Sequence, residues 1–250
     1  MTNTARFGAR PLRDGGTPIH VWRSAQQDLP VLDLTKCPEI VVVGAHPDDE
    51  TLGFGAAAAT LAGIGAHVRV VSASDGGASH GPLPPQERAR LERVRRAELC
   101  CALDALGLPE PISLGLPDGR LAEVEERLTD LLTDILSARP SGTWCAATWR
   151  GDGHPDHEAV GRAAALAAER SGSKLLEYPV WMWHWAHPGD DAVPWQRAQR
   201  VSPTPDGYAR KQAAAQLFQS QLEDRGQGAG PVLPPEVVHR LLEVDEVVFR

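Results

Sequence analysis

The segment "VVVGAHPDDETLG", residues 41–53, ends a hydrophobic run with one histidine and three acids inside five positions. His46 and Asp49 are three residues apart, so a tight turn lets both side chains face one point. An imidazole nitrogen and a carboxylate oxygen are common zinc donors. Acids at a helix start can instead cap the helix and suit its dipole. Capping explains neither His46 nor the crowding of Asp48, Asp49 and Glu50, whereas a bound cation explains both.

A second cluster, "GDGHPDHE" at residues 151–158, contains His154, Asp156 and His157. By itself it could be a polar helix cap with two surface histidines. Two His/Asp clusters at corresponding ends of one sheet are less expected by chance, and together they offer two histidines and one aspartate to a metal ion. Such a set leaves a coordination position open, which is the mark of a catalytic metal site.

The remaining groups, Asp48, Asp156 and one histidine, suit the hydrolysis of an amide. A metal ion lowers the pKa of bound water toward ~7. A nearby carboxylate can take a proton as water attacks a carbonyl and later deliver it to the leaving amine. A protonated histidine can stabilise the oxyanion. A nucleotide loop is rejected, because these acids would repel phosphate and Pro47 has no amide hydrogen to offer.

The elements that position these clusters alternate between strands and helices. Residue patterns predict strands at 39–45, 66–74, 111–116, 143–148 and 174–180, and helices at 51–65, 85–107, 121–138 and 158–172. This order predicts an α/β, Rossmann-like fold with a mostly parallel sheet and helices on both faces. Ligands of such sheets bind beyond the carboxyl ends of the strands. Both clusters, and a third, "SDGGASHG" at residues 74–81, therefore fall on one rim.

Two parts of the chain break this pattern. Residues 1–36 show little periodicity and predict an irregular N-terminal arm over a single domain at residues 37–250. From about residue 179 follow a Trp-rich segment, "PVWMWHWAHPGDDAVPW", and a Pro- and Gly-rich segment, "DRGQGAGPVLPPE". The alternation of Trp181, Trp183 and Trp185 suits a strand with one aromatic face. These rings could be a platform for a sugar or an apolar aglycone, or a small core beneath a long loop.

The hexapeptide "AHPDDE" at residues 45–50, followed by "HPDH" at 154–157, resembles the signature pair of the LmbE-like, or PIG-L, N-acetylglucosaminyl deacetylases. The resemblance covers roughly residues 40–178. It implies a zinc-dependent amidase on a Rossmann-like fold that removes acetyl from N-acetylglucosamine units. Position by position, it implies the zinc ligands His46, Asp49 and His157, the general base and acid Asp48, the oxyanion-stabilising His154, and Asp156, which tunes His154.

The same resemblance implies substrate-binding residues. The family's R-x-x-E-L motif begins at Arg95, which corresponds to a substrate contact in some members, and its sugar-binding aspartate matches Asp118. Each has a plainer interpretation, as an exposed helix charge for Arg95 and as a turn residue for Asp118. Two positions depart from the family. Asp152 stands where some members have an oxyanion-binding tyrosine, and Phe218 stands where a histidine often precedes an S-Q pair.

Composition limits the partners. A net charge of -8 and dispersed Lys and Arg argue against a nucleic-acid surface. The polar N-terminus predicts no signal peptide, and no apolar stretch approaches the ~20 residues that cross a bilayer, so we expect no membrane partner. Four cysteines without a CxxC pair predict reduced thiols in the cytoplasm.

We therefore expect a cytoplasmic N-deacetylase of a small amino-sugar substrate that depends on zinc (Zn2+) or another divalent metal. Its oligomeric state is left open. One alternative is a zinc hydrolase of a different N-acyl substrate. Another alternative, from a different functional class, is a non-catalytic sugar-binding protein with a degenerate site.

Overall fold

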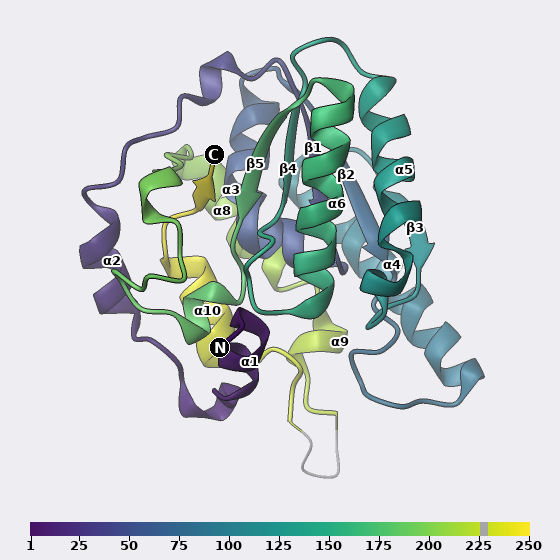
Figure 1. The fold of residues 1–250 in the computed structure, drawn as a ribbon. Coiled ribbons are helices and arrows are strands. Elements are labelled where there is room, and N and C mark those ends of the chain that lie inside the picture. The colour runs from purple at the N-terminus through teal and green to yellow at the C-terminus, as the bar shows by residue number, and fades with distance from the viewer. Residues whose placement is uncertain (226–229) are drawn as a thin grey trace.

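The computed structural model describes residues 1–225 and 230–250, and at its centre is a seven-stranded sheet (Figure 1). The strand order is β3-β2-β1-β4-β5-β7-β6. The first five strands of this order run parallel to one another, namely β1 (Glu39–Gly44), β2 (His67–Ser74), β3 (Ile112–Leu116), β4 (Trp144–Thr148) and β5 (Lys174–Tyr178). Each coincides with a predicted strand, so the Rossmann-like, mostly parallel fold is confirmed.

Two apolar cores lie on opposite faces of the sheet, because successive side chains of a strand point to opposite faces. In β1, Ile40 and Val42 join one core, whereas Val41 and Val43 join the other. Helices on both faces cover these cores: α3 (Asp49–Gly63), α4 (Pro85–Leu106), α8 (Pro205–Ala215) and α10 (Pro235–Glu243) on the first, and α5 (Glu125–Ser137) and α6 (Pro155–Ser171) on the second. Within the described part of the chain, none of the helices is long and apolar enough to cross a membrane.

Two short strands extend the sheet beyond what the sequence pattern predicts. β6 (Ala198–Arg200) pairs antiparallel with β7 (Val247–Phe249), and β7 pairs antiparallel with β5. Each has three residues, too few for a period-2 pattern to stand out. Helix α9 (Gln219–Leu222) follows α8. Of the Pro- and Gly-rich segment at 224–236, residues 226–229 lie outside the described residues.

The N-terminal segment differs from the predicted irregular arm. It contains the helices α1 (Asn3–Gly8) and α2 (Ile19–Gln26) and the 3-10 turns Leu12–Asp14 and Leu34–Lys36. The Thr2 hydroxyl oxygen caps α1 by accepting from the Ala5 amide at 3.2 Å. Trp22 of α2 is fully buried, and its indole N–H donates to the Trp183 carbonyl at 2.9 Å. Both helices are short, so their apolar periodicity is hidden in the sequence.

The predicted strand with one aromatic face is wrong. Trp183 and Trp185 belong to a short helix, α7 (Met182–Trp185), and their side chains are buried in the first core. The physical reason is the Asp152 carboxylate, which accepts from the amides of residues 180–182 at 2.9 Å each. A negative charge at successive free amides favours a helix start. The remaining 3-10 turns are Leu121–Val124 and Trp195–Arg197.

Candidate active site

The three polar clusters predicted for one rim lie together at the carboxyl ends of β1, β2 and β4. They surround a pocket of about 320 Å³. Two of the predicted site residues, Asp156 and His157, are buried against His46 and Asp49 respectively. The other predicted site residues line the pocket, namely His46, Asp48, Asp49, Arg95, Asp118 and His154.

The two ring nitrogens of His157 lie against two different carboxylates. Nδ1 lies 2.8 Å from Asp152 Oδ2, and Nε2 lies 3.1 Å from Asp49 Oδ1. Nε2 is buried, yet it has no hydrogen-bond partner among the residues that the structure describes. A buried polar nitrogen without a partner is costly. When Nδ1 donates to Asp152, Nε2 directs its lone pair toward Asp49, which is the arrangement of a metal-binding histidine.

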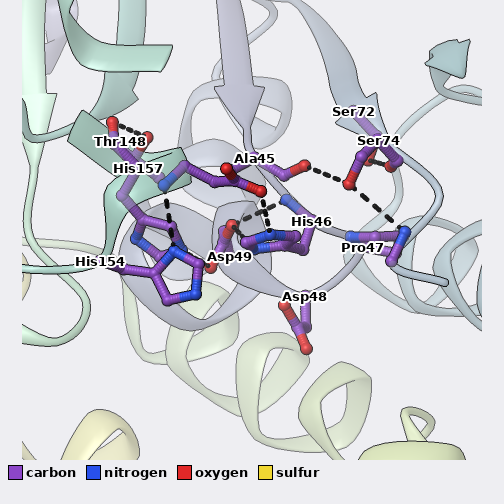
Figure 2. A network of polar contacts seen from close by, with 12 residues as sticks. Ala45, His46, Pro47, Asp48, Asp49, Ser72, Ser74, Thr148, His154 and His157 are labelled. Carbon is purple, nitrogen blue, oxygen red and sulfur yellow. Dashed lines mark hydrogen bonds and ion pairs between the residues drawn. The ribbon is translucent and has the colours of Figure 1, made fainter. Parts of the chain in front are cut away.

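His46 has the same arrangement with its nitrogens exchanged, and Figure 2 shows its ring beside Asp49. Nδ1 lies 3.4 Å from Asp49 Oδ2, whereas Nε2 lies 3.1 Å from Asp118 Oδ1 and 3.3 Å from Asp156 Oδ2. Each Asp49 oxygen thus faces one imidazole, and other carboxylates face the far nitrogens of both rings. This donor set fits a divalent cation. Donor atoms of two overlapping residue groups converge within 4.8 Å, His46–His154–His157 and His46–Asp118–Asp156, and Asp49 belongs to neither group.

Burial and neighbouring charges act in opposite directions on this cluster. Burial favours the neutral form of Asp49, but the adjacent His157 and His46 hold the pKa of its carboxyl well below the ordinary value. Burial likewise disfavours the charged form of His46, yet the carboxylates around it raise its pKa well above the ordinary value. The buried acids therefore require positive charge beside them, either from protons on the imidazoles or from a cation that replaces those protons.

Asp48 is directed away from Asp49 by an unusual backbone conformation. Its φ is 144°, in a region that favours glycine, and such a residue costs on the order of 1–3 kcal/mol. Figure 2 shows its carboxylate pointing away from Asp49 and the histidines. One oxygen accepts from Arg95 Nη2 at 3.0 Å. Burial raises the pKa of Asp48 to about 7, although the Arg95 charge opposes this shift.

Glu50 and Arg95 brace the turn that carries the two aspartates. Glu50 accepts from the Asp48 amide at 3.3 Å and from the Thr51 hydroxyl at 2.7 Å. Arg95 donates to the Pro47 carbonyl at 2.8 Å and to a carbonyl of the loop after β2 at 3.0 Å. Arg95 is only 2% exposed, so its interpretation as an exposed helix charge is wrong.

His154 caps helix α6 and lines the pocket. Its Nδ1 accepts from the Asp156 amide at 3.2 Å. Because an amide can only donate, the proton of a neutral His154 ring must be on Nε2. Burial and the neighbouring His157 and His46 lower the pKa of His154 to about 3. The neutral ring can still donate one hydrogen bond to an oxyanion, so the protonated form considered from the sequence is not required.

Two aspartates have contacts that the sequence does not predict. Asp156 was expected to tune His154, and its negative charge opposes the lowering of the His154 pKa. Its carboxylate also accepts from two amides of residues 119–121 at 2.7 and 3.1 Å and lies against His46. The Asp156 backbone amide donates to His154 Nδ1. Asp118 lines the pocket, yet one of its oxygens lies against His46 and the other accepts from an amide of the loop after β2 at 2.6 Å.

Sequence reasoning missed Asp152, which it noted only as a departure from a tyrosine. The Asp152 side chain is fully buried and joins His157 to the amides of residues 180–182. A signal was available, because an acid five residues before an expected histidine ligand can hold the far nitrogen of that ring. Phe218, the other departure, is 1% exposed and lies in the first core.

The far walls of the pocket come from segments outside the two signature motifs. Val180 and Trp181 belong to one wall, and Gln221, Val232 and Leu233 also line the pocket. Trp183 and Trp185 lie in the first core, and Trp195 packs against that core. The interpretation as a core beneath a loop thus holds for Trp183 and Trp185, whereas Trp181 lines the pocket and its use as a sugar platform stays a prediction.

Comparisons with known proteins agree with the fold and with the family that the two motifs suggest. The family model described as "PIG-L: GlcNAc-PI de-N-acetylase" matches residues 41–168. A 1D-myo-inositol 2-acetamido-2-deoxy-alpha-D-glucopyranoside deacetylase of Kineococcus radiotolerans is 30% identical over 245 residues, covering 84% of this chain and 63% of that protein. A deacetylase of the same name from Mycobacterium sp. (strain KMS) is 32% identical over 176 residues, covering 61% of this chain and 57% of that protein. The chain thus spans less than two thirds of the length of these curated relatives.

Solved structures share the fold at lower identity. The conserved protein TT1542 from Thermus thermophilus has a TM-score of 0.59 at 23% identity, covering 84% of this chain and 93% of that chain. The zinc inhibited form of teicoplanin deacetylase Orf2 has a TM-score of 0.61 at 18% identity, and the match covers 84% of this chain and 97% of that chain. N,N'-diacetylchitobiose deacetylase from Pyrococcus horikoshii has a TM-score of 0.57 at 21% identity, and the match covers 82% of this chain and 78% of that chain. By the matched family model and the relative from Kineococcus, the chain belongs to the PIG-L family.

Proposed function

We propose that this chain is a metal-dependent amide hydrolase that removes the acetyl group from an N-acetylated amino sugar of a small molecule. The observation that carries the proposal is the pair Asp48 and Asp49. The Asp49 carboxylate lies between the imidazoles of His46 and His157. Asp48 lines the pocket, and its backbone is strained. A protein that only binds sugar would not need a second carboxylate, Asp48, beside a complete set of metal donors. The names of the curated relatives support the amino-sugar class.

In this proposal, His46, Asp49 and His157 hold one divalent cation, and two imidazoles with one carboxylate favour zinc. When bound, the cation polarises a carbonyl oxygen and lowers the pKa of a bound water. The far ring nitrogens donate to carboxylates that fix the orientation of both rings, Asp118 and Asp156 for His46 and Asp152 for His157.

Asp48 is the proposed general base and acid. Its carboxylate takes a proton from the water that attacks the acetyl carbonyl carbon, and it later gives that proton to the nitrogen as the C–N bond breaks. The products are acetate and the free amine. Arg95 keeps the Asp48 carboxylate in place through the 3.0 Å contact. The Nε2–H of His154 donates to the developing oxyanion, and we propose that Asp118 and Arg95 also contact the sugar.

The direct test is release of acetate and of the matching free amine by the purified chain loaded with zinc. The substrates are 1D-myo-inositol 2-acetamido-2-deoxy-α-D-glucopyranoside and N,N'-diacetylchitobiose, the compounds in the names of the relatives. We expect acetate from at least one N-acetylated amino sugar, its loss on chelation and its return with zinc. Longer N-acyl analogues test for a different acyl group. Metal-loaded protein that binds these sugars but releases no acid would instead be a sugar-binding module.

We also propose a cytoplasmic location. The four cysteines are free thiols, and two of them, Cys100 and Cys101, are exposed. Exposed thiols persist in reducing compartments. Fractionation of cells that express the native gene, with detection of the protein by antibody, tests this location.

A further inference from the structure

Helix α1 packs against the active site although it lies outside the residues 41–168 that the family model matches. In Figure 1 it is the dark purple helix beside the label N, near the lower edge of the molecule. Its half-buried residues are Asn3, Thr4, Arg6 and Phe7, whereas the rest of the helix is exposed. Residues at this spacing share one helix face. The contacts of that face go to the loop before α6 and to the Trp-rich segment.

Two polar side chains of α1 hold the loop that leads into α6. Asn3 Nδ2 donates to the Gly151 carbonyl at 2.7 Å, and the Thr4 hydroxyl donates to Glu158 Oε2 at 3.2 Å. The other Glu158 oxygen accepts from the Gly153 amide at 3.2 Å. The loop is therefore connected to α1 both directly and through the first turn of α6.

Gly153, immediately before His154, allows a close approach of α1. Its φ is 93°, a conformation that favours glycine. A Cβ at this position would lie 3.0 Å from the Phe7 Cβ and 3.2 Å from the Asn3 carbonyl oxygen. With only hydrogen there, α1 packs directly on the backbone that carries His154.

Phe7 contacts two rings that line the pocket. Its ring centroid lies 5.0 Å from that of Trp181 and 6.5 Å from that of His154, within the roughly 4.5–7 Å range of aromatic pairs. Arg6 extends the contact to the Trp-rich segment, because its guanidinium lies over the Trp185 ring at 5.0 Å and pairs with Asp190. The α1 helix thus contacts both the oxyanion-side histidine and the aromatic wall.

We propose that α1 is a positioning element of the active site and that Phe7 is its central residue. Phe7 acts through His154, whose ring it faces and whose preceding residue, Gly153, it packs against, and through Trp181. This inference rests on the proposed function. Displacement of a catalytic group by about 1 Å can cost on the order of 10²-fold in rate, so loss of the Phe7 ring should slow turnover while the metal ligands stay in place.

The test compares Phe7→Ala with two matched variants. Phe7→Tyr restores the ring, and Leu12→Ala truncates another half-buried apolar residue of the N-terminal segment, one that packs against the first core. We expect kcat to fall by about 10- to 100-fold in Phe7→Ala with unchanged metal content, and to recover in Phe7→Tyr. Leu12→Ala should keep the wild-type kcat even where its Tm falls.

A second readout does not depend on activity. Hydrogen–deuterium exchange in the metal-free chain should rise at residues 151–158 and 180–185 in Phe7→Ala but not in Leu12→Ala. Asn3→Ala, which removes the bond to Gly151, is a milder variant if Phe7→Ala does not fold, and its exchange should rise at residues 151–158. Unchanged exchange at these residues, or a wild-type kcat in folded Phe7→Ala, overturns the proposal. If the wild-type chain hydrolyses no substrate, the proposed function is contradicted. The exchange measurement still tests whether α1 holds residues 151–158 and 180–185 in place.

Discussion

Asp48 and Asp49 are adjacent in the chain, but their carboxylates have different surroundings. Asp49 contacts two imidazoles, whereas Asp48 contacts the Arg95 guanidinium. We predict that Asp48→Asn keeps the fold and the metal, because asparagine tolerates positive φ better than most residues and can still accept from Arg95. Its kcat should fall by about 10²- to 10⁴-fold, since an amide cannot take the proton of the attacking water. Steady-state kinetics together with metal analysis measure both effects.

Two outcomes would contradict this assignment in different ways. Loss of metal from Asp48→Asn would make Asp48 a ligand and exchange the roles of the two aspartates. A near-wild-type kcat with metal retained would mean that another group is the general base, and His154 would be the first residue to test. Asp130→Asn is the control, because it makes the same change at an exposed residue of α5.

The Asp152 carboxylate contacts both His157 and the start of helix α7. It lies against His157 and accepts from the amides of residues 180–182. Asp152→Asn replaces one carboxylate oxygen by an NH2 group, which cannot accept a hydrogen bond from His157 or from the amides of residues 180–182. We predict that its metal affinity falls by about 10- to 100-fold, as measured by competition with a chelator, whereas Asp130→Asn keeps the wild-type value. Unchanged affinity in Asp152→Asn would mean that packing of α6 alone orients His157.

Elements with long local patterns are predictable from this sequence, and elements fixed by a few distant contacts are not. The β-branched run of β1 and the strong amphipathicity of α5 are local properties, and both were predicted. Helix α7 depends on Asp152, which lies about thirty residues earlier in the chain. Strands β6 and β7 depend on pairing with each other and with β5. No window of a few residues contains that information.

Helix α7 also carries a titratable link between the two ends of the chain. His184 Nε2 lies 3.1 Å from the Arg10 carbonyl oxygen, and Nδ1 lies 3.4 Å from Arg240 Nη1. A carbonyl only accepts and a guanidinium only donates, so the ring is neutral with its proton on Nε2. Burial, together with the charges of Arg240 and Arg10, lowers the pKa of His184 from 6.5.

The sign of the resulting pH dependence follows from this lowered pKa. Below about pH 6.5 the unfolded chain binds a proton at His184 that the folded chain resists, so this contribution to stability is present above that pH and is lost as the pH falls. We predict that His184→Gln, which can donate and accept without titrating, loses less stability than the wild type between about pH 7 and about pH 5. Urea unfolding at both pH values measures the free energy of unfolding of the two proteins. If both lose the same amount, protonation of His184 does not contribute to the loss of stability in acid.

For the molecule as a whole, topology explains how much of the site is predictable. Parallel strands bring the loops after β1 and β4 to one rim, so the proximity of His46 and His157 follows from the order of elements. The individual contacts depend on side-chain packing between distant segments. For this reason the motifs do not predict the contact of Asp156 with His46 or the contacts of α1 with the loop before α6.

The sheet edge that carries the candidate site concentrates negative charge in a chain whose net charge is already -8. A cation that binds only the folded chain stabilises it by about 2.7 kcal/mol at a 100-fold excess over Kd. In a domain of this size, each kcal/mol changes Tm by about 2–4 °C. We therefore predict that chelation and dialysis lower Tm by about 5–10 °C and that zinc restores it. The buried acids at this edge, each at most 8% exposed, are Asp48, Asp49, Glu50, Asp118, Asp152 and Asp156.

The matched variant for this experiment is His157→Ala, which removes one proposed donor from the interior of the site. Its Tm should be lower than that of the wild type and should not respond to zinc, because the remaining imidazole and carboxylate bind the cation too weakly to shift unfolding at the same concentration. Calorimetry with and without zinc measures the response, and metal analysis after gel filtration measures occupancy. A His157→Ala protein that keeps full occupancy and the full zinc-dependent rise in Tm would exclude His157 as a ligand.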